Sequence, residues 1–143
     1  MAVDAEHTVT IAAPLDQVLA VIRDVPGQPS WWPGLRRTEV LEEDDQGRAL
    51  RARVASDVKV VTDTFEVVYS HTDTGVTWQL DGTSLAQRRQ SGAWSVRDHP
   101  EGSEATLRLE IEATLPLPKL VQRRIVRDTV TGAVAGLKAR CER

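Results

Sequence analysis

The regular alternation of residue types from Ala105 to Leu115 restricts the fold of this chain more than any other feature. Every second residue is small or apolar, and the residues between them are threonine, arginine or glutamate. Successive side chains of a β-strand point to opposite faces, so this segment predicts a strand with one face packed and one face in water. Such strands are typical of antiparallel sheets and are not expected in a parallel sheet that is covered on both sides.

Weaker patterns along the rest of the chain complete a predicted order of elements. The segment 7–11 alternates and predicts a strand, and apolar residues at helical spacing predict a helix over 15–23. Prolines then indicate a broken turn or very short helix over 28–34, and about six strands follow between 36 and 115. An apolar stripe predicts a final helix over 119–140. Because helices and strands are segregated along the chain, the predicted fold class is α+β.

Composition and length exclude several classes of protein. The 143 residues suffice for one domain, which we predict over 1–143. No apolar run approaches the roughly 20 residues of a transmembrane helix, and the acidic start carries no secretory signal, so we expect a soluble, cytoplasmic protein. The net charge of −3 argues against a nucleic-acid partner. Scattered histidines (His7, His71 and His99), a single Cys141 and the lack of a glycine-rich phosphate loop predict neither a metal site nor a cofactor.

Positive charge is concentrated in the last segment of the chain. Residues 119–143 hold seven basic and two acidic side chains, whereas the chain as a whole has a net charge of −3. One interpretation is a solvated helix face whose cations suit the helix C-terminus. The other is a surface that makes transient contact with anionic lipid or binds an acidic protein partner.

Two glycines inside the predicted final helix, Gly132 and Gly136, require an explanation. A glycine in a helix costs about 1 kcal/mol relative to alanine, so a helix does not favour two of them without a reason. One explanation is that they leave volume for a ligand between the helix and the sheet. The other is close packing of the helix on its neighbours, with both glycines on one side.

Several motifs occur in a fixed order along the chain. They are the strand and helix start at 9–18, the paired tryptophans in the turn 29–34, the segment 65–69, the Gly-Ala-Trp at 92–94 and the closing helix at 116–143. Together they resemble the START-like, or Bet v 1-like (SRPBCC), superfamily of polyketide cyclases, dehydrases and lipid-transport proteins. The resemblance implies a helix-grip fold, in which a curved antiparallel sheet of about seven strands wraps around the long C-terminal helix. Two short helices would follow the first strand, and a hydrophobic cavity would lie between sheet and helix.

A small hydrophobic molecule such as a lipid, a quinone or a polyketide-like compound is the leading hypothesis for the ligand, which the protein would bind and carry. Apolar pockets with a few convergent polar groups are typical of such sites. The candidate ligand-binding residues are Trp31, Trp32, Phe65, Tyr69, Trp78, Trp94, Leu109 and Ala133. For each tryptophan, a place in the core is the alternative to ligand contact. The oligomeric state is open between a monomer and a homodimer.

Two further functions remain alternatives. A polyketide cyclase, aromatase or dehydrase would use Tyr69 as general acid or hydrogen-bond donor to a carbonyl, together with His71 or His7. Against it, Tyr69 could be an ordinary core tyrosine and His71 could cap the turn that follows it. We also find no inward-pointing polar series of the kind that the aromatase/cyclases carry. The third function is a protein-interaction module that uses the basic helix at Arg123, Arg124 and Arg127.

Overall fold

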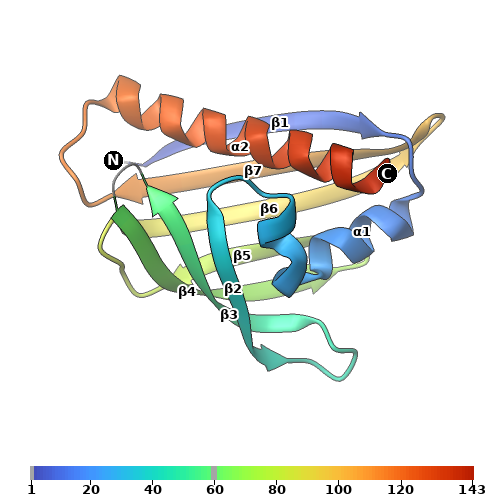
Figure 1. The fold of residues 1–143 in the computed structure, drawn as a ribbon, viewed down its shortest axis with the longest axis horizontal. Coiled ribbons are helices and arrows are strands. Elements are labelled where there is room, and N and C mark those ends of the chain that lie inside the picture. Colours follow the sequence, from blue (N-terminus) through green and yellow to red (C-terminus); the bar gives the residue numbers. More distant parts are fainter. Residues whose placement is uncertain (1, 59–60) are drawn as a thin grey trace.

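The computed structural model describes residues 2–58 and 61–143, and these residues form one antiparallel sheet and three helical segments (Figure 1). The strands are β1 (Val3–Ile11), β2 (Leu35–Glu43), β3 (Ala49–Val58), β4 (Val61–Thr72), β5 (Gly75–Asp81), β6 (Gln87–His99) and β7 (Gly102–Ala113). Their order across the sheet is β1-β7-β6-β5-β4-β3-β2. Consecutive strands from β2 to β7 are therefore neighbours, and β1 joins at the far edge beside β7.

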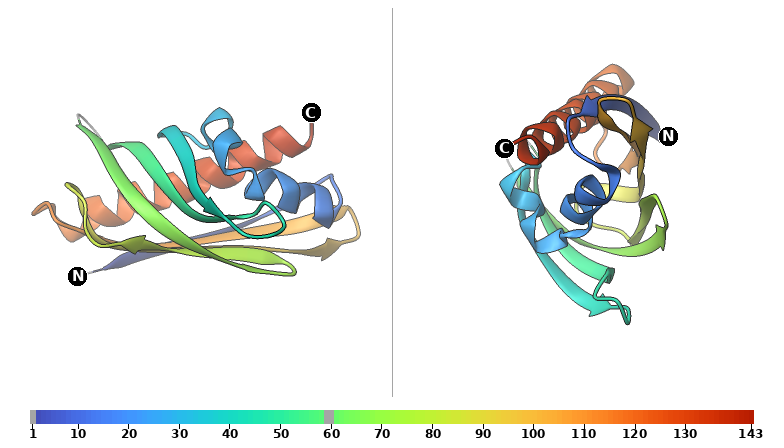
Figure 2. Two further views of the ribbon diagram at one scale, coloured as in Figure 1. Left: turned by 90° about the horizontal axis from the view of Figure 1, so that it is seen from below. Right: turned by 90° about the vertical axis from the view of Figure 1, so that its right-hand side faces the viewer.

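The helices connect and cover this sheet. The helix α1 (Leu15–Arg23) and the 3₁₀ helix η1 (Val25–Ser30) carry the chain from β1 at one edge to β2 at the other. The long helix α2 (Lys119–Cys141) runs along β1 and β7 (Figure 1). Figure 2 shows the sheet curling around the space beside α2. The α+β helix-grip prediction is confirmed, with two short helices after the first strand and the long helix at the end.

Hydrophobic periodicity placed the packed faces correctly. On β7, Ala105, Leu107 and Leu109 are buried, whereas Arg108 and Glu110 are exposed. The buried side of α2 consists of Val126, Val130, Ala133, Val134, Leu137 and Cys141. Burial of these faces in a single hydrophobic core is what holds sheet and helix together, because each buried aliphatic side chain contributes roughly 1.5–3 kcal/mol.

Gly136 lies where α2 approaches the turn after η1. A Cβ atom added to Gly136 would overlap the carbonyl oxygen of Trp31, so only glycine allows this approach. At Gly132 the nearest atom to an added Cβ is Pro33 Cγ, at an ordinary 3.7 Å. Close packing on the turn therefore explains Gly136, and the alternative of volume left for a ligand is wrong at this position.

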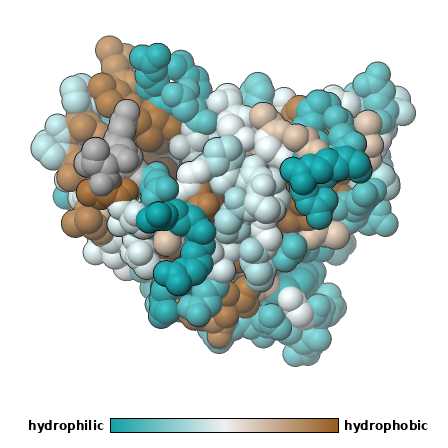
Figure 3. Space-filling view, in the orientation of Figure 1, coloured by the Kyte–Doolittle hydropathy of each residue, from teal (hydrophilic) through white to brown (hydrophobic). Residues whose placement is uncertain are grey.

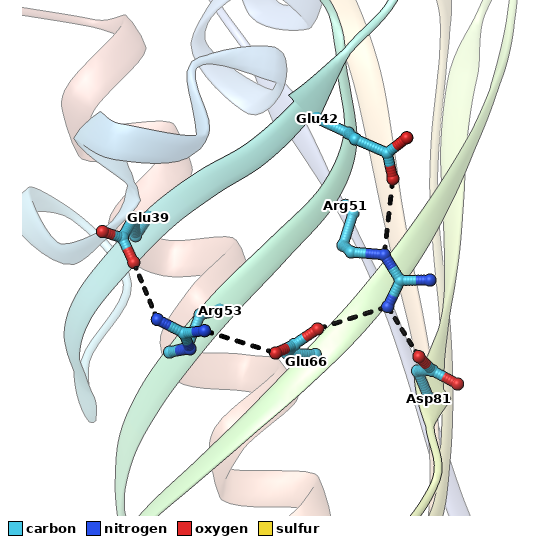
Figure 4. A network of polar contacts seen from close by, with 6 residues as sticks. All are labelled: Glu39, Glu42, Arg51, Arg53, Glu66 and Asp81. Carbon is cyan, nitrogen blue, oxygen red and sulfur yellow. Dashed lines mark hydrogen bonds and ion pairs between the residues drawn. The ribbon is translucent and has the colours of Figure 1, made fainter.

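An ion-pair network covers the outer face of the sheet (Figure 4). Its members are Glu39 and Glu42 on β2, Arg51 and Arg53 on β3, Glu66 on β4 and Asp81 on β5. Arg51 contacts Asp81 at 2.6 Å and Glu66 at 3.3 Å, and Arg53 contacts Glu66 at 3.5 Å. These side chains are partly exposed, so each pair contributes at most about 1 kcal/mol. The network links four neighbouring strands on the side away from the core.

Candidate ligand cavity

A cavity of about 200 Å³ lies between the inner face of the sheet and the first half of α2. Its wall is mainly apolar and includes Trp32, Leu35, Phe65, Leu109, Ile111 and Val126. Leu115 and Asp57, which are exposed, also line it, so the cavity reaches the surface beside the start of α2. We call this space the main chamber.

A side chamber of about 50 Å³ adjoins the main chamber. Residues Trp32, Leu35, Phe65 and Gln90 line both spaces. The side chamber adds Gln28, Val54, Val67, Tyr69 and Trp78. Most of these side chains point inward from β3, β4 and β5, as expected from the alternation along those strands.

The four tryptophans form one cluster centred on Trp32. Its ring centroid lies 5.8 Å from those of Trp31 and Trp94 and 6.1 Å from that of Trp78. The turn that carries Trp31 and Trp32 is held by Gln28, whose amide donates to the Ile22 carbonyl at 3.1 Å. Trp94 and Trp78 meet Trp32 edge-to-face and Trp31 is tilted against it, and such ring contacts stabilise a packed aromatic wall.

The candidate ligand-binding residues divide into two groups. Trp32, Phe65 and Leu109 line the main chamber, and Tyr69 and Trp78 line the side chamber with Trp32 and Phe65. The remaining candidates, Trp31, Trp94 and Ala133, are buried in the core outside the lining of both chambers. Trp31 and Trp94 support the cavity indirectly because they pack on Trp32.

A chain of hydrogen bonds forms the polar part of the cavity wall. Trp78 Nε1 donates to Gln90 Oε1 at 2.8 Å, and Gln90 Nε2 donates to Gln87 Oε1 at 2.5 Å. Gln87 Nε2 then donates to Asp63 Oδ2 at 3.1 Å. The indole can only donate, so it fixes the orientation of both amides from one end of the chain.

Asp63 anchors this chain from the other end and is fully buried. Its carboxyl oxygens also accept hydrogen bonds from the Ser84 hydroxyl at 2.7 Å and from the Ala86 N–H at 3.2 Å. The carboxyl group therefore ties β4 to the loop before β6. It also holds the Gln87 amide in one orientation, because a carboxyl oxygen of Asp63 accepts a hydrogen bond from the amide N–H of Gln87.

Three polar side chains on β4 and β6 point inward, and the strand patterns did not reveal them. Asp63, Gln87 and Gln90 all lie on the inner side of the sheet, as their burial and cavity contacts show. Asp63 shares its strand face with Phe65, so period-2 alternation read back from Phe65 was the available signal. Gln87 and Gln90 are three positions apart and would face opposite sides of a regular strand. A register shift between Gln87 and Arg89 turns both inward.

The structure brings two of the proposed catalytic side chains, Tyr69 and His71, together and leaves His7 apart. His7 is exposed on the edge strand β1. His71 Nε2 contacts the Ala49 carbonyl at 2.7 Å, so this histidine joins β4 to the start of β3 and does not cap the turn that follows it. Its ring stacks on Tyr69, with centroids 6.4 Å apart. Burial raises the pKa of Tyr69 above its ordinary value, so the phenol keeps its proton at neutral pH and has an O–H available to donate.

Within residues 2–58 and 61–143, no group of three or more histidine, cysteine, aspartate or glutamate side chains is arranged to hold a metal ion. Over the same residues, no helix is long and apolar enough to cross a membrane.

Comparison with solved structures shows the same fold over almost the whole chain. A START superfamily protein from Mycobacterium smegmatis is 18% identical with a TM-score of 0.88, covering 97% of each chain. The Zhui aromatase/cyclase from a Streptomyces species is 20% identical with a TM-score of 0.79, covering 100% of this chain and 95% of that one. A Thermus thermophilus protein, TTHA0849, is 21% identical with a TM-score of 0.79, covering 99% of this chain and 97% of that one. No significant match was found among curated proteins.

A sequence-family profile settles the relationship that these folds indicate. The profile described as polyketide cyclase / dehydrase and lipid transport matches residues 2–142. The match includes the curved sheet, both chambers of the cavity and nearly all of α2. The chain therefore belongs to the polyketide cyclase/dehydrase and lipid transport family, and it has the fold of the START superfamily protein.

Proposed function

We propose that this protein binds a small hydrophobic molecule in the main and side chambers and carries it through water. The observation that supports the proposal most directly is an apolar cavity that reaches the surface and has a small, ordered polar group in its wall. Binding would remove apolar ligand surface from water at roughly 25 cal/mol per Å². The rigid tryptophan cluster lowers the ordering cost of binding, because its rings are already packed.

The size of the cavity limits the ligand. At about 200 Å³, the main chamber is smaller than the roughly 300–1,000 Å³ typical of pockets for drug-sized ligands. A compact one- or two-ring molecule fits this limit, as does one end of a longer chain whose remainder leaves through the opening by α2.

The polar wall indicates which functional group the ligand carries. The Gln90 amide uses one N–H on Gln87 and one carbonyl lone pair on Trp78, which leaves a second N–H. Because Trp78 and Asp63 fix both ends of the chain, the amide cannot flip to present its oxygen instead. The protonated Tyr69 hydroxyl is a second donor in the adjoining chamber. Both donors favour a ligand with a carbonyl or another hydrogen-bond acceptor.

The same geometry favours binding over cyclase chemistry. An enzyme that moves protons needs a group whose pKa lies near neutral pH within reach of the substrate. The polar groups that line the two chambers include the amides and a protonated phenol. His7 is exposed on β1, and His71 stacks behind Tyr69 with its Nε2 on the Ala49 carbonyl, outside the lining of both chambers. Turnover of a polyketide-like substrate that disappears in Tyr69→Phe would support the enzyme instead.

Two bicyclic probes that differ by a carbonyl oxygen test the proposed binding mode. We expect α-tetralone to displace the dye anilinonaphthalene sulfonate at a concentration about 2- to 10-fold lower than tetralin, the size of one net hydrogen bond. Ala113→Leu, which places extra carbons in the main chamber, should weaken both probes alike. Displacement by neither probe, or no effect of Ala113→Leu, would contradict the proposal.

Replacing the donors shows which of them recognises the carbonyl. Gln90→Met should remove the preference for α-tetralone and leave the affinity for tetralin within about 2-fold, because only the hydrogen bond is lost. Gln79→Met on the exposed side of β5 is the matched control and should keep the preference. Loss of the preference in Tyr69→Phe rather than Gln90→Met would assign the contact to the side chamber. Retention in both variants would contradict recognition of the carbonyl by the cavity wall.

A further inference from the structure

The cations in the first half of α2 have no structural explanation within the described chain. Lys119, Arg123, Arg124 and Arg127 are exposed, and none of them forms an ion pair with residues 2–58 or 61–143. Lys119 lies in the first turn, where the helix dipole disfavours positive charge and where no acidic residue is present. The expected match between basic residues and the helix C-terminus holds only for Lys138 and Arg140.

These cations also repel one another along the helix. Arg123 and Arg127 are four positions apart, and Arg124 and Arg127 are three apart, so like charges are neighbours on one face. Each such pair of like charges slightly destabilises the helix. Because these like charges do not stabilise the fold, we expect an anionic partner to neutralise them.

Exposed aliphatic side chains surround the same end of the molecule. Among the described residues, Leu120 and Leu85 are the most exposed large hydrophobic side chains, at 77% and 68%. Leu115 and Val121 are also exposed. The β5–β6 loop lies next to the end of β7, since the Thr114 hydroxyl donates to the Leu85 carbonyl at 2.6 Å. Figure 3 shows hydrophobic residues gathered at the end of the molecule where α2 begins.

We define the α2 rim as these neighbouring aliphatic and basic side chains. Its members are Leu85, Leu115, Leu120, Val121, Arg123, Arg124 and Arg127. Leu120 and the three arginines follow the spacing i, i+3, i+4, i+7 and therefore share one face of the helix. Leu115 also lines the main chamber, so the rim borders the opening of the cavity.

We infer that the α2 rim docks on an anionic lipid bilayer. Arginines beside exposed leucine and valine on one helix face are the features of a helix that lies in a membrane interface. The arginines attract anionic headgroups, and the aliphatic side chains leave water among the acyl chains. Docking there places the cavity opening against the lipid, so a hydrophobic ligand can pass between them without crossing water.

A lipid surface fits the rim better than an acidic protein does. Interfaces between proteins are anchored by aromatic residues and arginines seated in well-packed pockets. The exposed hydrophobic residues of the rim are leucine and valine, and they come from three separate segments, which are the β5–β6 loop, the segment after β7 and α2. A fluid bilayer can accommodate such scattered aliphatic side chains without a complementary shape.

Co-sedimentation with vesicles tests the inference on the whole chain. We expect the protein to bind vesicles of phosphatidylcholine mixed with phosphatidylglycerol, to bind phosphatidylcholine alone much less, and to be released by salt. A triple variant with glutamine in place of Arg123, Arg124 and Arg127 should show a partition coefficient onto the mixed vesicles that is about 100-fold lower. The matched control replaces Arg140 in the last turn of α2 and Arg143 just beyond it with glutamine, and it should bind like the unchanged protein.

A second variant separates the apolar contribution from the electrostatic one. Leu120→Ser should weaken binding to the mixed vesicles by roughly 10-fold or more and leave its salt dependence unchanged. Binding that is equal on both vesicle types, or unaffected by the three arginine replacements, would overturn the inference. Absence of vesicle binding together with arginine-dependent binding of an acidic protein would also overturn it, in favour of a protein partner. Displacement of the dye by α-tetralone should persist in the rim variants, so failure of docking is distinguishable from failure of the cavity proposal.

Discussion

Gly136→Ala is expected to lower the free energy of unfolding by about 1–3 kcal/mol, although alanine is the better helix former. The added Cβ would overlap the Trp31 carbonyl oxygen, a backbone atom that cannot rotate away. Either α2 or the turn after η1 must move, which disturbs the packing of Trp31 on Trp32. Urea-induced unfolding followed by circular dichroism gives the change directly.

Gly132→Ala on the same helix is the matched control and should change stability in the opposite direction. Its added Cβ would lie 3.7 Å from Pro33 Cγ, which is ordinary van der Waals contact. The helix should therefore gain up to about 1 kcal/mol from the substitution. If both alanine variants are stabilised, α2 does not approach the Trp31 turn as closely as described. In that case the ligand-volume explanation for Gly136 becomes open again.

Asp63→Asn is expected to destabilise the protein by about 1–3 kcal/mol, because a buried donor loses its acceptor. The two carboxyl oxygens accept from Ser84, Ala86 and Gln87, and an asparagine replaces one of these oxygens with an NH2 group, which donates and cannot accept. Asp63→Ala removes all of these contacts and should cost more. Chemical unfolding of the two variants under the same conditions measures both effects.

Asp81→Asn is the control for the charge change itself. Asp81 belongs to the ion-pair network on the outer face, and its side chain is 54% exposed. Its replacement should therefore change stability by less than about 1 kcal/mol. Asp63→Asn should also weaken the preference for α-tetralone, because Gln87 and Gln90 lose their fixed orientation. Equal effects of the two asparagine variants would show that Asp63 does not anchor the amide chain.

Local patterns predicted much of the fold because each depends on a short repeat. The alternation over 105–113 lies within β7, and the apolar stripe over 119–140 corresponds to α2. Leu115, which the alternation assigned to the packed face, lies beyond the end of β7 and is exposed. Prolines limited α1 to 15–23 as predicted. The strands proved longer than their patterns. For example, β1 begins at Val3 rather than at His7, because edge pairing with β7 continues where the alternation of residue types is weak.

The candidate site was predictable in part, for the same reason. Phe65, Tyr69, Trp78 and Leu109 were assigned to inner strand faces by alternation, and the structure places them in the lining of the cavity. Pattern alone did not distinguish Trp32 from its neighbour Trp31. The turn after η1 directs one ring toward both chambers and the other into the core.

The sequence by itself determined the type and order of the elements and the face that each presents to the core, because periodicity is a property of neighbouring residues. Only the tertiary structure decided which side chains meet. The register shift in β6 turns Gln87 and Gln90 to the same side, and pairing with β4 brings Asp63 to them. The approach of α2 to the Trp31 carbonyl explains Gly136. These contacts join residues far apart in the chain, so strand register and helix position, which no local repeat specifies, decide them.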